Sequence, residues 1–446
     1  MTPVNTTTAY QQLQCAPGYT SNLCAACEPW HFINAEFECR ACPPLWKNSL
    51  LAVAAFLATI ALVMYTLYTN LDENYSDDEE DDQASLGQDS LADLLKVAII
   101  HAQYYIIIMR LPVDYPSDLA KLSGALSAVT GAENAVAYSY SCFFPADASD
   151  GQARIQLLGA LLVPFVVIVT SMFVWGVSSN FYRVLSQADA TLDLNTQLWV
   201  ISVVAVFILY PGWAQAALSV FSCYKIDDGQ TGLYPQNQKA AWRHGYWVRD
   251  MAQECYTGVH LRLYVPIGIA AVAVLCFGPP LASFLILPRY FWWESVLMLE
   301  ELALVAVEVF GRGLKSVTHQ ILVMLTAFIV ISAINITCKP NRLRIITMFE
   351  SMSMTVLSLT VSLSLFFVVD DGLSAADEKP VGALILAINV VLLATFLGVL
   401  LRDTWNKLMG TASRANHIAL AALTKMKGNR SARKGVSPAE GDGLWC

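Results

Sequence analysis

The chain has 446 residues, of which 56% are hydrophobic and only 14% are charged, and its mean hydropathy is +0.49. A soluble globular protein is far less apolar, so the composition excludes a soluble helical bundle and predicts an integral membrane protein. The formal net charge of −9 comes almost wholly from residues 71–82, which include eight acidic side chains, and the remainder of the chain is about neutral.

Residues 1–45 are predicted to form a small cysteine-rich module. Its five cysteines are Cys15, Cys24, Cys27, Cys39 and Cys42. Two interpretations fit this pattern. The paired C-x-x-C units match two zinc knuckles, which together supply four thiolates. The C-x-P-G-Y turn and the glycosylation sequon at Asn5 instead favour a disulfide-rich extracellular module.

An odd number of cysteines predicts a partner outside the module. Cys142 lies in a loop predicted on the same side of the membrane, and a cysteine upstream of this chain is the alternative. Cys223 and Cys255 flank a further loop on that side and are the expected second pair. The first residues have neither a basic n-region nor an apolar h-region. The first span is therefore expected to act as a signal anchor, unless the chain is the trimmed end of a longer product.

Nine apolar segments are long enough to cross about 30 Å of hydrocarbon as helices. They are residues 46–68, 91–109, 155–177, 198–221, 259–287, 292–310, 317–337, 345–369 and 381–401. The predicted class is an all-α integral membrane protein with about nine transmembrane helices and a small N-terminal disulfide-rich module. Its parts are a first transmembrane helix at 46–69, a disordered acidic cytosolic linker at 70–90, a multi-pass domain at 91–401 and a basic cytosolic tail at 402–446.

Two features of these segments are unfavourable for a regular membrane-spanning helix. The second segment is short and is followed at once by Arg110 and Pro112. Prolines also lie inside several segments, at Pro164, Pro211, Pro266, Pro279 and Pro280. A membrane helix tolerates proline where neighbouring helices satisfy the backbone groups that it frees.

Basic residues in the loops set the orientation, because Lys and Arg accumulate on the cytosolic side. The tail after residue 401 carries eight of them up to Lys434, so it is predicted to be cytosolic. With nine spans, the cysteine module then lies outside the cell, which indicates the plasma membrane and favours disulfides over zinc. We therefore expect no metal and no cofactor. Arg40 and Lys47, on the outer flank of the first span, oppose this orientation.

The sixth segment, WWESVLMLEELALVAVEVF, carries four glutamates and no basic residue. Glu294, Glu301 and Glu308 are seven residues apart, so they drift only ~20° per step and share one helix face. Glu300 is predicted to point elsewhere. Because a carboxylate facing lipid at the membrane centre costs about 2.5–3.5 kcal/mol, this acidic face should turn toward the protein interior.

Three interpretations of the acidic face remain. The glutamates pair structurally with buried polar groups, they line a path for cations or protons, or the span boundary is misplaced. The candidate polar partners are His101, Gln103, His319 and Asn335. Glu294 and Glu308 lie near the predicted ends of the segment, where water or lipid headgroups would reach them.

Short motifs along the chain resemble those of one family, in the same order. CAPGYTSNLCAAC resembles C-x-x-G-Y-T-G-x-x-C-x-x-C, with Ser21 and Asn22 where a glycine is usual. KVAIIHAQYYIIIMRLPVDYP is similar to its K-I-x-x-x-x-x-Q span and V-x-W-P turn, with Tyr115 in the place of the tryptophan. Three later segments, YWVRDMAQECYTGVH, PRYFWWE and KPNRLRIITMFESMSM, resemble its Y-L-x-x-D-x-x-x-x-C-x-x-x-x-H, W-E and R-P-Y-x-x-x-x-x-N-x-x-E stretches.

This family comprises large membrane proteins of algae, oomycetes and other protists. In them a cysteine-rich module similar to that of ephrin receptors leads into a multi-pass domain labelled transient-receptor-potential-like. The resemblance covers nearly the whole chain and implies this fold and an ion-channel or sensor role. Glu300 and Glu301 stand where the family has a basic pair, so a role of those basic groups does not carry over.

We expect a cation channel or channel-like ion conductor. Its expected partners are the lipid bilayer, cations and further copies of the chain in a homo-oligomer. The alternative is a cell-surface receptor or adhesion protein whose cysteine-rich module binds a ligand. No enzyme is expected, because the sequence lacks a P-loop, a nucleophile elbow and an H-E-x-x-H pair. Nucleic-acid binding is not expected either, because the basic tail is short and adjoins a membrane span.

Overall fold

The computed structural model describes residues 15–20, 24, 26–33, 39–76, 89–130, 142–143, 151–186, 194–224, 244–286, 292–314, 316–338, 344–369, 379–402, 404–405 and 409. The chain divides into two compact units, Met1–Leu392 and Leu393–Cys446, and the first contains the helical bundle. Asn5 and most of the basic tail lie outside the described residues, as do positions 77–88 of the acidic linker.

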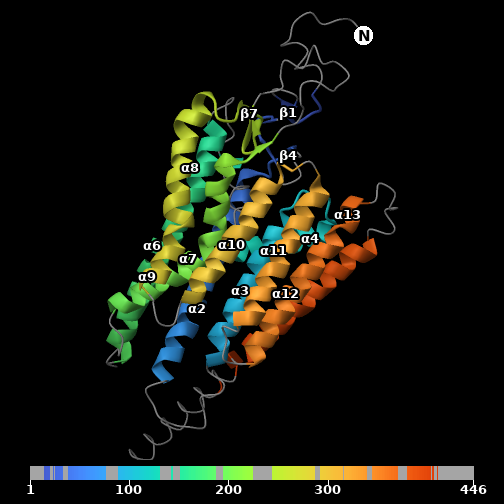
Figure 1. Cartoon of the computed structure of the whole chain (residues 1–446). Helices are drawn as coiled ribbons and strands as arrows, with labels where there is room; N and C mark the ends of the chain where they lie inside the picture. The colour runs from blue at the N-terminus through green and yellow to red at the C-terminus, as the bar shows by residue number, and fades with distance from the viewer. Residues whose placement is uncertain are drawn as a thin grey trace, which may run out of the picture. The chain divides into compact units, whose positions relative to one another are not determined.

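The bundle is built from long helices, which Figure 1 shows side by side. They are α2 (Leu45–Ser76), α3 (Asp89–Met109), α6 (Gly151–Ser186), α7 (Leu194–Leu218), α10 (Trp292–Gly311), α11 (Val317–Cys338) and α12 (Arg344–Ser364). Shorter helices are α4 (Ser117–Thr130), α8 (Val265–Ala271), α9 (Gly278–Ile286) and α13 (Phe366–Val369), with π-helical turns η4 (His260–Tyr264) and η5 (Val272–Cys276). A further helical segment covers 379–402.

Eight helical segments in the described part of the chain are long and apolar enough to cross a membrane. They are Leu45–Asn70, Leu91–Met109, Gln156–Ser178, Leu194–Phe221, His260–Leu285, Val317–Cys338, Arg344–Val368 and Lys379–Arg402. The remaining predicted span, α10, is also helical over 20 residues, and its four glutamates set it apart from these eight. The predicted class, an all-helical multi-pass membrane protein, is confirmed.

Three details differ from the sequence prediction. Helix α2 continues to Ser76 and so includes the start of the acidic run. The predicted span 259–287 is divided into η4, α8, η5 and α9, because Pro266, Pro279 and Pro280 interrupt the regular hydrogen-bond pattern. Helix α4 was not predicted at all.

Figure 1 shows the short strands at one end of the bundle. The described disulfides lie in and beside these strands, so we call this end the disulfide end. In the N-terminal module, β1 (Tyr19–Thr20) pairs with β2 (Ala26–Cys27), and β3 (His31–Ile33) pairs with β4 (Cys39–Ala41). The loop after α7 forms a three-stranded sheet of β5 (Cys223–Tyr224), β6 (Tyr246–Trp247) and β7 (Asp250–Glu254).

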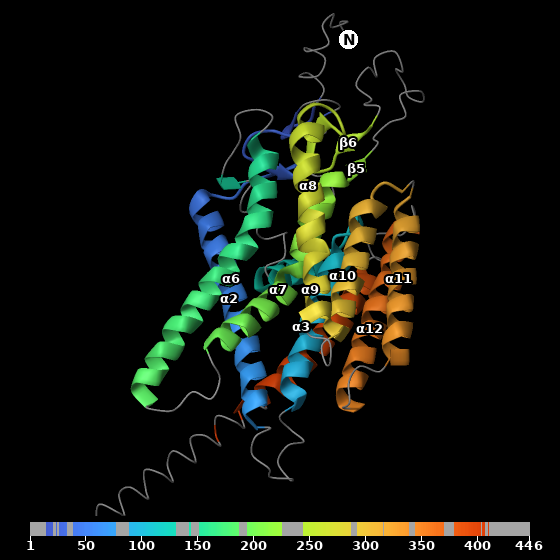
Figure 2. The same ribbon diagram turned by 60° about the vertical axis from the view of Figure 1, so that its left-hand side comes forward.

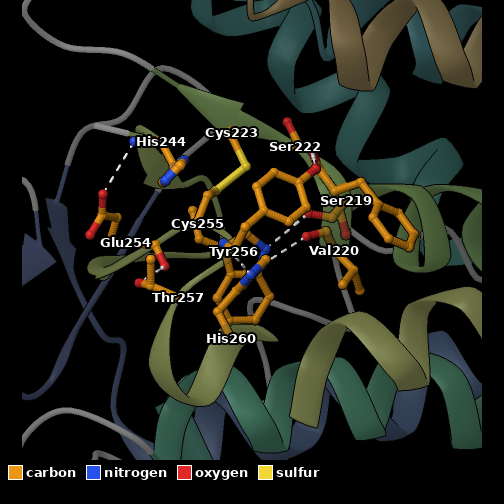
Figure 3. The surroundings of a disulfide bond; sticks show 12 residues. Ser219, Val220, Ser222, Cys223, His244, Glu254, Cys255, Tyr256, Thr257 and His260 are labelled. Atoms are coloured by element: carbon orange, nitrogen blue, oxygen red, sulfur yellow. Dashed lines mark hydrogen bonds between the residues drawn. A yellow bond between two sulfur atoms is a disulfide. The ribbon is translucent and has the colours of Figure 1, made fainter. Parts of the chain in front are cut away.

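All eight cysteines proposed as disulfide candidates form disulfides. The pairs are Cys15–Cys24, Cys27–Cys39, Cys42–Cys142 and Cys223–Cys255. The fifth cysteine of the module is thus joined to the loop that follows α4. Cys223–Cys255 joins the two ends of one loop, and Figure 3 shows its surroundings. Beside it, Nδ1 of His260 accepts from the backbone N–H of Tyr256, and Nε2 donates to the carbonyl of Val220, both at 3.0 Å. These bonds attach the segments on either side of the sheet to the start of η4.

Helix α10 lies inside the first unit, where it packs against α3, α7, α9 and α11. Figure 2 shows it between α9 and α11. The outer helices carry large apolar side chains on their exposed faces, such as Leu57 on α2 and Phe173 on α6, which are 59% and 70% exposed. In a membrane protein such faces meet lipid, whereas α3 and α10 bury polar groups away from it.

Buried polar side chains satisfy the backbone groups that proline frees. Pro211 has no N–H, so it leaves the carbonyl of Phe207 without its usual partner in α7. Nε2 of Gln103 lies 3.4 Å from that carbonyl oxygen and 3.1 Å from that of Ile208, and donates to both. In the same way, Pro280 frees the carbonyl of Cys276, which accepts from the hydroxyl of Tyr210 at 2.6 Å.

This arrangement predicts a coupling between Gln103 and Pro211. Replacing Gln103 by leucine should lower the free energy of unfolding by about 1–3 kcal/mol, because it leaves a buried carbonyl without a donor. In a Pro211→Ala background the loss should be smaller, since the alanine N–H restores a donor for Phe207. Unfolding of the four proteins by SDS titration in mixed micelles measures this double-mutant cycle. Equal losses in both backgrounds would contradict the coupling.

Candidate functional site

The four glutamates of α10 lie at different positions along a helix that its neighbours cover in part, leaving Leu299 and Phe310 exposed. Glu294, at its start, forms an ion pair with Lys96 of α3, with Nζ and Oε1 3.1 Å apart. Both side chains of this pair keep some exposure, 28% for Lys96 and 17% for Glu294. The other three glutamates are buried. The prediction that the acidic side of this helix turns away from lipid agrees with their burial.

Glu300 faces α3, α11 and α12. Its Oε2 accepts from the hydroxyl of Tyr104 at 3.3 Å, and Asn335 of α11 and Glu350 of α12 lie near its carboxylate. The heptad pattern predicted that Glu300 points away from the other three. It does face different neighbours, but those neighbours are also in the protein interior, because helices cover α10 on several sides.

Glu301 is the most isolated acid of the helix. Its exposed fraction is 0%, and neither carboxylate oxygen has a hydrogen-bond partner among the described residues. Its charged neighbours are Glu300 and Lys96, and Tyr210 of α7 lies on the same side. Glu301 therefore faces the part of α7 that contains Pro211, where Tyr210 donates to the carbonyl of Cys276 at the end of η5.

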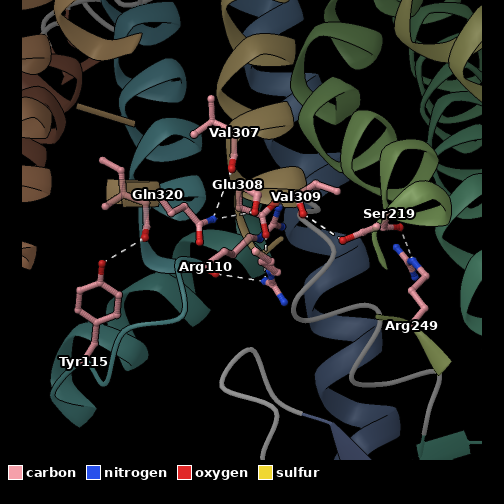
Figure 4. Close-up of polar contacts among 11 residues, drawn as sticks. Arg110, Tyr115, Ser219, Arg249, Val307, Glu308, Val309 and Gln320 are labelled. Atoms are coloured by element: carbon pink, nitrogen blue, oxygen red, sulfur yellow. Dashed lines mark hydrogen bonds and ion pairs between the residues drawn. The ribbon is translucent and has the colours of Figure 1, made fainter. Parts of the chain in front are cut away.

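Glu308 belongs to a polar cluster at the disulfide end of α10 (Figure 4). One carboxylate oxygen pairs with Nη2 of Arg312 at 3.0 Å, and the same nitrogen donates to the backbone carbonyl of Arg110 at 3.2 Å. Nε2 of Gln320 donates to the carbonyls of Glu308 and Val307, at 2.9 and 3.4 Å, which satisfies two groups in the last turns of α10.

The expectation that water or headgroups reach Glu308 is wrong, because its exposed fraction is only 1%. Arg110, which follows α3, is likewise 1% exposed. Sequence reasoning missed this cluster because Arg110 and Arg312 lie just beyond predicted spans, where basic residues usually meet water. A usable signal was the position of Arg312, four residues after Glu308, where an ion pair forms along one helix face.

The predicted polar partners of the glutamates have mixed outcomes. Asn335 does lie beside Glu300. His101 instead places Nδ1 3.0 Å from the hydroxyl of Ser353, and Gln103 serves the carbonyls of α7. His319 is exposed and takes no part. Lys96, the partner of Glu294, was not predicted as one.

Helix α3 thus contributes to several polar contacts along the bundle. Lys96, Tyr104 and the carbonyl of Arg110 each contact α10 or the turn after it. Beyond α3, the hydroxyl of Tyr115 lies 3.1 Å from Oγ of Ser364, and burial raises the pKa of Tyr115 above its ordinary value. Buried polar groups inside an apolar bundle can bind a charge or a hydrated ion only where they are not already paired with one another.

No cluster of three or more His, Cys, Asp or Glu side chains that could hold a metal ion occurs within the described parts of the chain. Comparison with family models, curated proteins and solved structures finds no match to this chain. The function has therefore to be inferred from the site itself.

Proposed function

We propose that this multi-pass membrane protein is a cation channel or a channel-like ion conductor. The observation that carries the proposal is the state of Glu301, whose buried carboxylate has no hydrogen-bond partner in the described structure. A buried polar group without a partner lowers stability, so it persists mainly where function requires it. In a membrane domain an ionisable group of this kind is, by default, part of an ion or proton pathway.

The neighbours of Glu301 support this proposal. α7 contains Pro211, and the segment that follows η4 is divided into α8, η5 and α9, so the acid lies beside one proline-containing helix and near one discontinuous helix. Ion sites in membrane transport proteins are often found beside discontinuous helices. The resemblance to the transient-receptor-potential-like group, including its ephrin-receptor-like module, points to the same class of function.

The proposed location is the plasma membrane, with the disulfide end outside and the basic tail in the cytosol. Disulfides form in oxidising compartments, which the extracellular space and the secretory lumen provide. The described disulfide pairs lie in the N-terminal module and in the loops at this end of the bundle.

The test is whole-cell current in cells that express the chain, measured with several bath cations. Glu301→Gln keeps the shape of the side chain but cannot carry a negative charge, so we expect reduced cation selectivity or reduced current. A matched control is Glu254→Gln, which removes the same charge from the three-stranded sheet at the disulfide end.

Surface biotinylation measures how much of each protein reaches the cell surface, and currents are compared at equal surface expression. A current that changes with Glu301→Gln and not with Glu254→Gln supports conduction past α10. A wild-type current that Glu301→Gln leaves unaltered would make this glutamate structural. Absence of current in every protein under all tested conditions would argue for the receptor alternative.

One observation favours a receptor or adhesion function. Trp30 is 59% exposed and has a positive φ of 67° in the turn between β2 and β3, a backbone conformation that non-glycine residues rarely adopt. An exposed indole on a disulfide-bonded scaffold is a common anchor for protein partners. Capture of a soluble ligand by intact cells that Trp30→Ala abolishes, without any current in the wild type, would establish this alternative.

A further inference from the structure

The N-terminal module is joined to the bundle by a very short piece of chain. Strand β4 ends at Ala41, Cys42 is bonded to Cys142, and α2 begins at Leu45. The three steps from Cys42 to Leu45 span at most about 11 Å when fully extended. The end of β4 that leads into α2 is therefore held close to the start of the membrane span.

The turn between β2 and β3 lies at this same end of the module. Strand β3 is antiparallel to β4, and His31 is opposite Ala41, so the start of β3 lies beside the end of β4. The N–H of Cys42 donates to the carbonyl of Trp30 at 2.8 Å. Trp30 is thus hydrogen-bonded through its backbone to a residue that lies only three positions before α2.

Trp30 occupies a backbone conformation that tryptophan rarely adopts. The N–H of His31 donates to the carbonyl of Glu28 at 3.0 Å, which closes a β-turn with Pro29 and Trp30 at its centre. The positive φ of 67° at Trp30 is usually taken by glycine or asparagine at this position of a turn. The tryptophan side chain is 59% exposed, so packing inside the module does not explain its presence.

The start of α2 lies at the depth of the lipid headgroups. The candidate span Leu45–Asn70 has 26 residues and is about 39 Å long, whereas the hydrocarbon layer is about 30 Å thick. Its ends therefore extend into the headgroup layer. Trp46, in the first turn, is 66% exposed, and Lys47 is exposed next to it. Tryptophan and lysine at the end of a span typically lie at this interface.

Basic side chains flank the same point of the chain. Arg40 of β4 and Lys47 of α2 are both exposed, whereas Glu28 is the one acidic residue in the described part of the module. Guanidinium and ammonium groups bind phosphate oxygens through charge-assisted hydrogen bonds. Two cations near two exposed indoles therefore match the chemistry of a phospholipid surface, in which phosphates lie above an apolar layer.

We propose that the N-terminal module docks on the surface of the membrane that α2 crosses. The indoles of Trp30 and Trp46 insert at the boundary between headgroups and hydrocarbon, and Arg40 and Lys47 contact lipid phosphates. Tryptophan suits this boundary because its ring is apolar and its N–H is a donor. Burial of about 100 Å² of the exposed Trp30 indole favours the docked state by roughly fifty- to hundredfold.

The test is photo-cross-linking of the whole purified chain in phosphatidylcholine nanodiscs. The variants Trp30→benzoylphenylalanine, Trp46→benzoylphenylalanine and Thr20→benzoylphenylalanine each carry one photoreactive side chain. Thr20 is the matched control, because it is exposed in the same module but pairs with Ala26, four residues before Trp30. Mass spectrometry identifies lipid adducts, and non-reducing peptide mapping verifies that the disulfides are intact.

Position 30 should form lipid adducts at least about tenfold more often than position 20, because docking keeps only the former in lipid most of the time. Position 46 is the positive reference and should react to a similar extent as position 30. Frequent adducts at position 46, with as few at position 30 as at position 20, would overturn the docking.

The role of the basic residues is tested in mixed nanodiscs of phosphatidylcholine and phosphatidylglycerol. Adducts at position 30 should contain a roughly two- to fivefold excess of the anionic lipid, because Arg40 and Lys47 attract its net charge. Adding Arg40→Gln and Lys47→Gln should remove this excess. Absence of any excess, or an excess that these two replacements leave unchanged, would overturn the phosphate contacts.

A second measurement does not need the photoreactive side chain. Glycine readily adopts the positive φ at position 30, so Trp30→Gly should fold with its disulfides intact. The difference in emission between the wild type and Trp30→Gly isolates the fluorescence of Trp30. Lipids that carry a nitroxide near the headgroup should quench that emission, whereas aqueous iodide should not. Quenching by iodide alone would overturn the docking.

Docking and conduction are tested separately, because none of these readouts depends on current. Lipid adducts at position 30 support docking whether or not the protein conducts ions. Capture of a soluble protein ligand that Trp30→Gly abolishes, without lipid adducts at position 30, would assign the turn to the receptor alternative and overturn docking.

Discussion

Replacing Arg312 by methionine is expected to lower the free energy of unfolding by about 3 kcal/mol. The arginine side chain is 12% exposed and pairs with Glu308, whose side chain is 1% exposed. Removing one partner of a buried ion pair typically costs 3–5 kcal/mol, because the remaining charge stays in a poorly solvated place. Methionine keeps much of the volume and flexibility of the arginine stem, so packing changes little.

The unfolding free energy is measured by SDS titration in mixed micelles. Lys121→Met is the control, since Lys121 pairs with Asp118 at 2.7 Å but both side chains are largely exposed, at 75% and 67%. That exposed pair should be worth less than about 1 kcal/mol. Adding Glu308→Gln to Arg312→Met should recover much of the loss. Similar losses for Arg312→Met and Lys121→Met would show that burial does not strengthen the Glu308 pair.

Replacing Glu301 by methionine is expected to stabilise the fold and to abolish or strongly reduce the cation current. The carboxyl group is fully buried without a hydrogen-bond partner in the described structure, and such a group lowers stability by about 1–3 kcal/mol. Methionine has a similar length and fills the same space with apolar atoms. Opposite changes in stability and function would identify Glu301 as a functional residue.

The same SDS titration and the current measurement are made on one set of variants. Glu300→Met is the matched comparison. Glu300 is next to Glu301 in the sequence, but its carboxylate accepts a hydrogen bond from Tyr104. Replacing Glu300 should therefore lower the free energy of unfolding. A Glu301→Met protein that is less stable than the wild type would mean that the carboxylate has structural partners. In that case the proposed role in conduction loses its main support.

The sequence was sufficient to predict the membrane class and the approximate positions of the spans. Hydrophobic length alone selects transmembrane helices, because each segment must satisfy its backbone hydrogen bonds within itself when it enters lipid. The pairing of Cys223 with Cys255 was also predictable, because both residues flank one loop. Helix α4 was not predicted. Its 14 residues include four hydroxyl side chains and two charged ones, Asp118 and Lys121, and such a composition is also typical of an external loop.

The individual roles of the glutamates depended on the tertiary structure. The heptad spacing in the sequence determined that Glu294, Glu301 and Glu308 recur along one side of a helix that must avoid lipid. It did not determine which of them acquires a partner. Lys96 and Tyr104 come from α3, and only the packing of α3 against α10 brings them to Glu294 and Glu300. Arg312 lies four residues after Glu308, a spacing that the sequence contains, but the burial of this pair depends on the neighbouring helices.

The sequence by itself therefore determined a helical membrane protein with a disulfide-rich end and an acidic helix in its interior. Only the tertiary structure decided that Glu301 has no hydrogen-bond partner among the described residues and that the last turn of α4 lies beside Thr59 of α2. The physical reason is the range of the interactions. Hydrophobic length and helix periodicity are local properties of the chain, whereas hydrogen bonds and ion pairs between helices depend on which distant segments pack together.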